Sequence, residues 1–103
     1  MTVEKLLIVV ETSLDDDQAI DTITIDLKGK SSLGDYMIIA SGRSARHVGA
    51  IAGHLQKAIK GAGFGTAHTE GMSSGDWVLI DTGDIIIHLF RPEVREFYSL
   101  EKM

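Results

Sequence analysis

The chain has 103 residues, of which 44% are hydrophobic and 24% charged, so one domain over residues 1–103 is expected. The absence of cysteine excludes disulfide scaffolds, thiolate metal sites and cysteine nucleophiles, and a single proline excludes collagen-like and proline-rich disordered chains. The net charge of −5 argues against a protein that binds nucleic acid by neutralising phosphates. The apolar run over residues 6–10 is too short to cross a membrane and lacks the features of a signal peptide, so a cytoplasmic protein is expected.

The charge is distributed unevenly along the chain. Residues 36–69 contain four basic side chains and no acidic one, whereas residues 1–35 and 70–103 carry net charges of −5 and −4. This pattern indicates either two faces with different partners or one face that pairs with itself.

The beginning of the chain predicts a helix followed by a strand. Apolar residues at helical spacing favour a helix over residues 2–14 with Thr2 as its N-cap, while β-branched residues within it leave a strand open as an alternative. Three aspartates at residues 15–17 are expected in a solvated turn, because acidic side chains oppose the dipole at a helix C-terminus. Residues 22–27 alternate polar and apolar, as in a half-buried strand.

The middle of the chain predicts a buried strand and a long helix. Residues 36–40 form an apolar run that is typical of a central strand. An apolar stripe from residue 48 to residue 62 predicts a helix that ends at Gly61 and Gly63. Residues 65–70 form a short, weak strand.

The last third predicts a hairpin and a final helix. Strands over residues 77–81 and 84–90 flank Thr82-Gly83, which suits a two-residue primed turn. With that loop, the pairs that face each other are Asp81/Asp84, Ile80/Ile85, Leu79/Ile86, Val78/Ile87 and Trp77/His88. One face is then wholly apolar (Val78, Ile80, Ile85, Ile87, Leu89), and the other is mixed (Trp77, Leu79, Asp81, Ile86, His88).

Pro92 opens a short helix after this hairpin, since its missing N–H costs nothing there. The complete order, α-β-β-α-β-β-β-α, predicts an α/β fold of the α+β type, in which a mixed β-sheet is flanked by helices.

Metal and acid–base chemistry find little support in the residue pattern. His47 and His54 are seven residues apart without an evident third ligand, so solvated histidines are favoured over a zinc site. Asp81 and Asp84 flank a turn that is expected to be exposed, which disfavours a catalytic dyad. No catalytic, cofactor-binding or metal-binding residue is predicted.

Nucleotide binding is the sharpest enzymatic alternative. Residues 41–44 join a buried strand to a helix N-terminus, where free backbone N–H groups and Arg43 suit an anion. The loop lacks the glycines and the Lys-Ser/Thr ending of the known phosphate-binding motifs, so an N-cap at Ser44 is favoured.

Three segments form a specific combination: residues 31–48, Glu70-Gly71, and the series Trp77…Asp81-Thr82-Gly83-Asp84…His88-Leu89-Phe90…Arg95-Glu96-Phe97-Tyr98-Ser99-Leu100-Glu101. In this combination the chain resembles the Iojap-type ribosomal silencing factors. The resemblance covers about residues 14–101 and implies a reduced nucleotidyltransferase-like fold. The spacing of Asp81 and Asp84 does not match the Asp-x-Asp of nucleotidyltransferases, so two-metal phosphoryl transfer lacks its ligands. A small nucleotide-binding enzyme of that fold is the alternative reading.

The resemblance implies a translational repressor and not an enzyme. Members of this family bind the large ribosomal subunit at its universal ribosomal protein L-fourteen, block joining of the small subunit, and lower translation when nutrients are limiting. They are often homodimers. The residues that match the ribosome-facing end of the family are Trp77, Asp81, Asp84, His88, Arg95, Tyr98 and Glu101.

Trp77 and Tyr98 are expected to act as apolar anchors, and Arg95 to orient Tyr98 or make a charged contact. The acids are expected to pair with basic residues of the ribosomal protein. Contact with rRNA is expected to be minor or absent because the net charge is negative.

Overall fold

The computed structural model describes residues 2–30, 32 and 34–98, and for residues 96–98 it describes the backbone alone. The elements follow in the predicted order: α1 (Val3–Asp16), β1 (Ile20–Asp26), β2 (Tyr36–Ser41), α2 (Ala45–Gly61), β3 (His68–Glu70), β4 (Trp77–Asp81), β5 (Ile85–Phe90) and α3 (Pro92–Tyr98). The predicted α/β class with a mixed sheet and flanking helices is confirmed.

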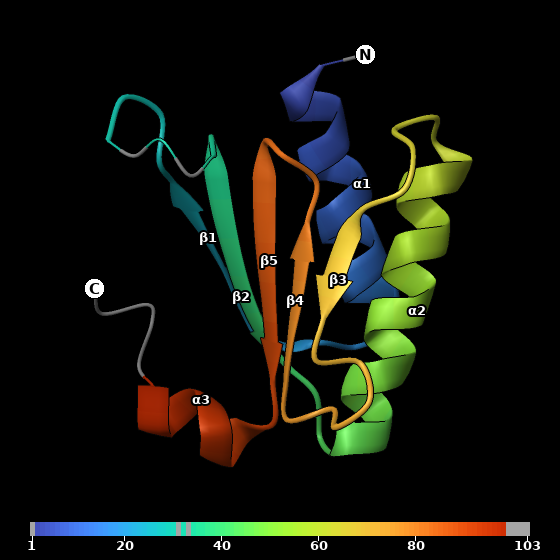
Figure 1. Cartoon of the computed structure of the whole chain (residues 1–103), viewed down its shortest axis with the longest axis vertical. Coiled ribbons are helices and arrows are strands. Elements are labelled where there is room, and N and C mark those ends of the chain that lie inside the picture. The colour runs from blue at the N-terminus through green and yellow to red at the C-terminus, as the bar shows by residue number, and fades with distance from the viewer. Residues whose placement is uncertain (1, 31, 33, 99–103) are drawn as a thin grey trace.

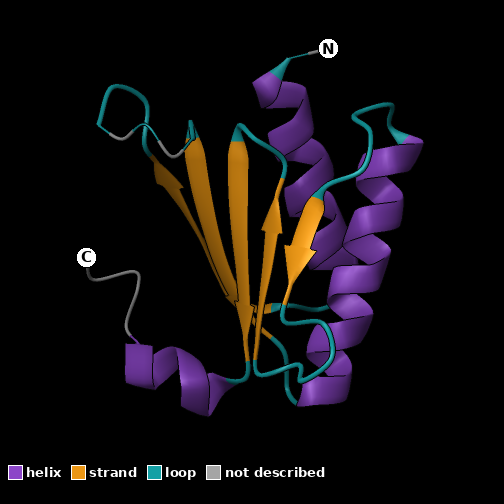
Figure 2. Cartoon of the chain, viewed as in Figure 1, coloured by secondary structure: helices purple, strands orange, loops and turns teal. Residues whose placement is uncertain are grey.

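The five strands form one sheet in the order β1-β2-β5-β4-β3 (Figure 1). The β2 and β5 strands are parallel, and every other neighbouring pair is antiparallel. The α1 and α2 helices pack side by side on one face of this sheet (Figure 2). None of the described helices combines the length and apolar character needed to span a bilayer.

The core lies between the two long helices and the sheet. It is filled by aliphatic side chains, since alternate strand residues point toward the helices. From α1 and α2 it takes Leu6, Val10, Leu14, Val48, Ile51, Ala52, Leu55 and Ile59, and from the strands Ile38, Ala40, Val78, Ile80, Ile85, Ile87 and Leu89. The wholly apolar hairpin face is therefore the core face, as the sequence predicts.

Both long helices begin at the predicted N-caps. The Thr2 hydroxyl accepts a hydrogen bond from the Lys5 N–H at 3.2 Å, and the Ser44 hydroxyl accepts one from the His47 N–H at 3.1 Å. The predicted end of the first helix is wrong, because α1 continues through Asp15 and Asp16. Burial of Leu14 at 0% exposure holds this last turn against the core, which outweighs the unfavourable dipole interaction.

The β1 strand differs from its prediction in position and burial. It begins at Ile20 instead of residue 22, and of its residues only Ile20 and Ile25 are half-buried. A register irregularity between Ile20 and Ile23 interrupts the alternation that the sequence predicts. The strand also lies at the edge of the sheet, where one partner strand is missing.

The predicted hairpin register is wrong by two residues. Trp77 pairs with Phe90, Leu79 with His88, and Asp81 with Ile86. The two-residue loop is Gly83-Asp84, because the Thr82 N–H donates to the Ile85 carbonyl at 3.0 Å. Gly83 has φ +96° at the first loop position, where a side chain would be strained. A shift of two residues keeps every side chain on its predicted face.

Candidate functional site

The second face of the sheet carries the mixed side of the hairpin, which we call the aromatic face. It consists of Ile23, Ile25, Met37, Ile39, Ser41, Trp77, Leu79, Asp81, Ile86, His88 and Phe90. The α1 and α2 helices lie on the opposite side, and α3 lies at the end of the aromatic face where Ser41 and Phe90 are (Figure 1). This face therefore carries the predicted site residues of β4 and β5.

Three rings form a cluster on the aromatic face. The Trp77 ring lies with its centroid 5.0 Å from that of Phe90 and 5.8 Å from that of His88, and the His88 and Phe90 rings are stacked at 6.1 Å. Phe90 is fully buried, whereas Trp77 and His88 are half-buried. Phe90 thus supports two rings that reach solvent, although it is not among the site residues predicted from the sequence.

A hydrogen bond fixes the orientation of the Trp77 indole. Its Nε1–H donates to Nδ1 of His88 at 2.9 Å, so this nitrogen carries no proton. Burial lowers the pKa of His88, which favours the neutral ring. The neutral imidazole then carries its proton on Nε2. Trp77 is therefore held in one orientation by a contact within the chain.

The loop before β4 approaches the backbone of Trp77 closely. Gly71 has φ +82°, and a Cβ atom at this position would lie closer than 3.0 Å to the Trp77 carbonyl oxygen. The Arg91 guanidinium pairs through Nε with the Asp76 carboxylate at 2.7 Å, and the Arg91 N–H donates to the Asp76 carbonyl at 3.2 Å. The backbone at the start of β4 is therefore held at Asp76, by Arg91, and closely packed at the Trp77 carbonyl, by Gly71.

Arg95 joins α3 to the sheet. Its side chain is 8% exposed, and Nη1 donates to the Ser41 hydroxyl at 3.0 Å and to the Ile20 carbonyl at 3.3 Å. This places Arg95 among structural contacts of β1 and β2. Tyr98 ends α3, but its side chain lies outside the described residues, as does the whole of Glu101.

The hairpin tip carries two acids at the other end of β4, about 13 Å along the strand from Trp77. The Asp81 carboxylate accepts a hydrogen bond from the Gly83 N–H at 2.8 Å, and Asp84 is exposed. Asp81 and Asp84 do not lie opposite each other in the hairpin, contrary to the predicted register, because Asp81 lies opposite Ile86. The structure thus brings Trp77 and His88 together and leaves the acids at a separate end.

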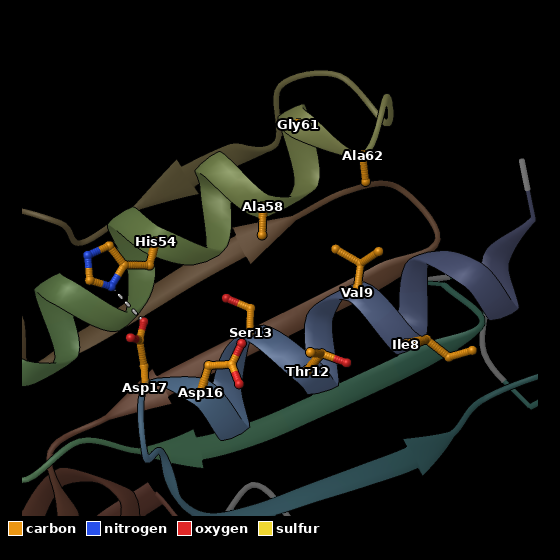
Figure 3. Close-up of a pocket in the computed structure, with 10 residues that line it drawn as sticks. All are labelled: Ile8, Val9, Thr12, Ser13, Asp16, Asp17, His54, Ala58, Gly61 and Ala62. Atoms are coloured by element: carbon orange, nitrogen blue, oxygen red, sulfur yellow. Dashed lines mark hydrogen bonds and ion pairs between the residues drawn. The ribbon is translucent and has the colours of Figure 1, made fainter.

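The two histidines of α2 are bound to the end of α1. Asp17 accepts a hydrogen bond at its carbonyl from Nε2 of His47 at 2.9 Å, and its carboxylate lies 2.8 Å from Nδ1 of His54. This last pair lies at one end of a groove of about 640 Å³ between α1 and α2 (Figure 3). Within residues 2–30, 32 and 34–98, no group of three or more His, Asp or Glu side chains could hold a metal ion.

The loop considered for nucleotide binding uses two of its N–H groups, those of Gly42 and Arg43, within the chain. The Gly42 N–H donates to the Phe90 carbonyl at 3.0 Å, and the Arg43 N–H donates to Nδ1 of His47 at 2.8 Å. The Ser44 hydroxyl accepts from the helix, as the N-cap interpretation predicts. A Cβ atom on Gly42 would lie 2.8 Å from atoms of Val48, so the loop is packed against the helix and leaves no cradle there.

These features define a class: a small α/β protein whose sheet has helices α1 and α2 on one face and an aromatic cluster on the other. The family model described as "Ribosomal silencing factor during starvation" matches residues 1–103. The chain belongs to this family.

Individual relatives agree with that assignment. The ribosomal silencing factor RsfS of Zymomonas mobilis is 60% identical over 100 residues, which cover 97% of this chain and 75% of the relative. A crystal structure of a protein from Chromobacterium violaceum has a TM-score of 0.94 at 36% identity, and the match covers 99% of this chain and 85% of that one. A mouse relative named "Mitochondrial assembly of ribosomal large subunit protein 1" is 36% identical over 90 residues, or 84% of this chain and 40% of the relative.

Proposed function

We propose that this protein represses translation by binding the large ribosomal subunit at its universal ribosomal protein L-fourteen, where it blocks joining of the small subunit. Membership of the ribosomal silencing factor family supports a role at the ribosome in the regulation of translation. The name of the mouse relative supports the large subunit as the partner. The proposed action needs occupancy of a surface and no reaction, so the protein is not an enzyme in this proposal.

The observation that carries the proposal is the orientation of Trp77 on the aromatic face. A tryptophan fixed by His88 and Phe90 loses little conformational entropy when a partner covers it. Tryptophan is also among the residues that most often dominate the energy of protein interfaces. Trp77 is therefore the proposed anchor, and His88 both orients it and contacts the partner.

The acids of the proposed site supply charge complementarity. Asp84 is exposed at the hairpin tip, and Asp81 is half-buried beside it. Both would face lysines and arginines of a basic ribosomal protein, which accelerates encounter more than it strengthens the complex. Glu101 and Tyr98 complete the proposed site on the basis of the family motif. Arg95 contributes by holding α3 against the sheet.

A charge reversal at the hairpin tip tests the proposed surface. Asp84→Lys leaves the turn backbone intact, because Asp84 contributes its carbonyl oxygen to the turn contacts with Asp35 and Tyr36. Asp15→Lys makes the same charge change at an exposed position of α1 and is the matched control. We expect Asp84→Lys to weaken binding to purified large subunits by about 1 kcal/mol, or about fivefold, mainly through slower association.

Equal affinity of the two variants in a sedimentation assay would contradict the placement of the site. A light-scattering assay of subunit joining then tests the repression itself, and joining that proceeds normally at saturating protein would refute the proposed block. The proposal includes a homodimer in the cytoplasm as the free form of the protein, which analytical ultracentrifugation and fractionation can test.

A further inference from the structure

A row of basic side chains lies along the outer side of α2. Arg46, Lys57 and Lys60 are exposed and lie 11 and 14 residues apart, close to three and four helical turns. They therefore share one side of the helix, over a length of about 21 Å. The buried residues of α2, such as Ile51 and Leu55, lie on the opposite side against the sheet. The row thus points away from the aromatic face.

A groove lies beside this row. It has a volume of about 340 Å³, runs between α2 and the segment that enters β3, and is lined by Gly53, Gln56, Lys57, Lys60, Thr66 and Ala67. The lining side chains offer two ammonium groups, an amide and a hydroxyl, and no carboxylate. Such a set suits an anion that accepts several hydrogen bonds, such as a phosphate group.

The cations of this surface are not neutralised within the described part of the chain. The ion pairs found there involve Lys28, Arg91 and two histidines, and none of them involves Arg46, Lys57 or Lys60. In a chain with a net charge of −5, three uncompensated cations on one helix face form a local positive field.

We propose that the α2 basic face, defined as Arg46, Lys57, Lys60 and the adjoining groove, binds the phosphate backbone of structured RNA while the aromatic face holds the ribosomal protein. The inference rests on the proposed function, since the ribosome supplies the RNA. Because the two surfaces lie on opposite sides of the sheet, both can be occupied at once. The negative net charge keeps affinity for free RNA low, and docking of the aromatic face supplies the high local concentration of phosphate. The contact is therefore secondary, and it tightens a complex that already exists.

The salt dependence of binding to large subunits tests this contact. The double variant Lys57→Gln/Lys60→Gln and its control Lys5→Gln/Lys30→Gln both change the net charge by −2, and all four lysines are exposed. Each lost phosphate contact should reduce the slope of log affinity against log salt by about 1. Loss of both contacts in Lys57→Gln/Lys60→Gln, the α2 variant, should therefore reduce the slope by about 2. When the salt concentration rises fourfold, from 50 to 200 mM, the fold-loss of affinity should then be about 16 times larger for the wild type than for the α2 variant.

The control variant should keep the wild-type slope. If the two double variants have the same slope, the α2 basic face does not touch phosphate and the inference is wrong. That outcome is separate from the test of the hairpin tip, because Asp84→Lys would still weaken subunit binding. If Asp84→Lys also binds like the wild type, the placement of the ribosomal-protein site fails as well. The proposed function itself fails only if subunit joining proceeds normally at saturating protein.

A second measurement identifies the source of the phosphate. In NMR titrations with a 16-base-pair RNA duplex, we expect the amide signals of Gly53, Lys57, Lys60 and Thr66 to shift in the millimolar to high micromolar range. Inorganic phosphate or a nucleoside triphosphate at the same concentration should shift them far less. Saturation by either small anion at micromolar concentration would instead make the groove a free-anion site. Loss of a homodimer in the α2 variant would make it a subunit interface, and either result would overturn the inference.

Discussion

The contact between Gly71 and the Trp77 backbone can be isolated by a pair of glycine substitutions. Gly71 and Gly65 have nearly the same φ, +82° and +83°. The left-handed backbone conformation of an alanine therefore destabilises the folded state by the same amount at either position, about 1–2 kcal/mol. They differ in their surroundings. A Cβ on Gly65 meets nothing within 4 Å, whereas a Cβ on Gly71 would overlap the Trp77 carbonyl oxygen. Relief of that overlap requires movement of the backbone, for which overpacking costs of about 1–3 kcal/mol are typical.

Urea denaturation of the two variants measures the difference. We expect Gly65→Ala to lose about 1–2 kcal/mol and Gly71→Ala about 2–5 kcal/mol, out of a total of about 5–15 kcal/mol for a chain of this length. Gly71→Ala should also change the fluorescence of Trp77, the only tryptophan. Equal destabilisation by the two substitutions, with unchanged fluorescence, would refute the close approach and would show that this loop does not position Trp77.

Two further predictions concern the contacts around the aromatic face. Arg95→Ala should lower the free energy of unfolding by about 2–4 kcal/mol, because it leaves the Ser41 hydroxyl and the Ile20 carbonyl without their charged donor. Urea denaturation measures this loss, and a value below about 1 kcal/mol would contradict the role of Arg95 in holding α3 against the sheet. Burial lowers the pKa of His88 in the folded state, so between the folded and unfolded pKa values the unfolded chain binds more protons at this residue. The stabilisation linked to the neutral His88 is therefore present above about pH 6.5, the ordinary pKa of histidine. It is lost as the pH falls from there toward the folded-state pKa. The free energy of unfolding should therefore fall more between pH 7 and pH 5 in the wild type than in His88→Gln, and parallel pH profiles would rule out the neutral histidine that accepts from Trp77.

Local patterns were sufficient to predict the elements of this fold. The N-caps at Thr2 and Ser44 and the alternation within the hairpin each depend on neighbouring residues, and the structure has them all. The end of α1 was not predictable in the same way. Whether the aspartates stay helical depends on how Leu14 packs against the core, which is a tertiary contact.

The missing parts of the candidate site are contacts between residues far apart in the chain. Arg95 and Ser41 are 54 residues apart, and no local pattern links a helical arginine to a serine at a strand end. Phe90 could have been found, because it has the same parity as His88 on β5 and so lies on the same face. The predicted mixed face ends at His88 because the predicted register puts Trp77 opposite that residue instead of opposite Phe90.

The hairpin explains why the two predicted faces are correct although the predicted register is not. A slip of one residue would have turned Trp77 toward the core and Val78 toward solvent, whereas a slip of two exchanges partners within each face. Burial penalises the first error strongly, because Val78 and Ile80 are completely buried on the core face. Burial does not distinguish between registers that differ by two residues, because each side chain stays on the same face. The choice between such registers is made by the turn that joins β4 and β5. Gly83 takes a positive φ at the first position of its turn, and this turn fixes which ring lies opposite Trp77. Hydrophobic alternation therefore determines which face carries Trp77, while the turn at Gly83 determines that Phe90 lies opposite it.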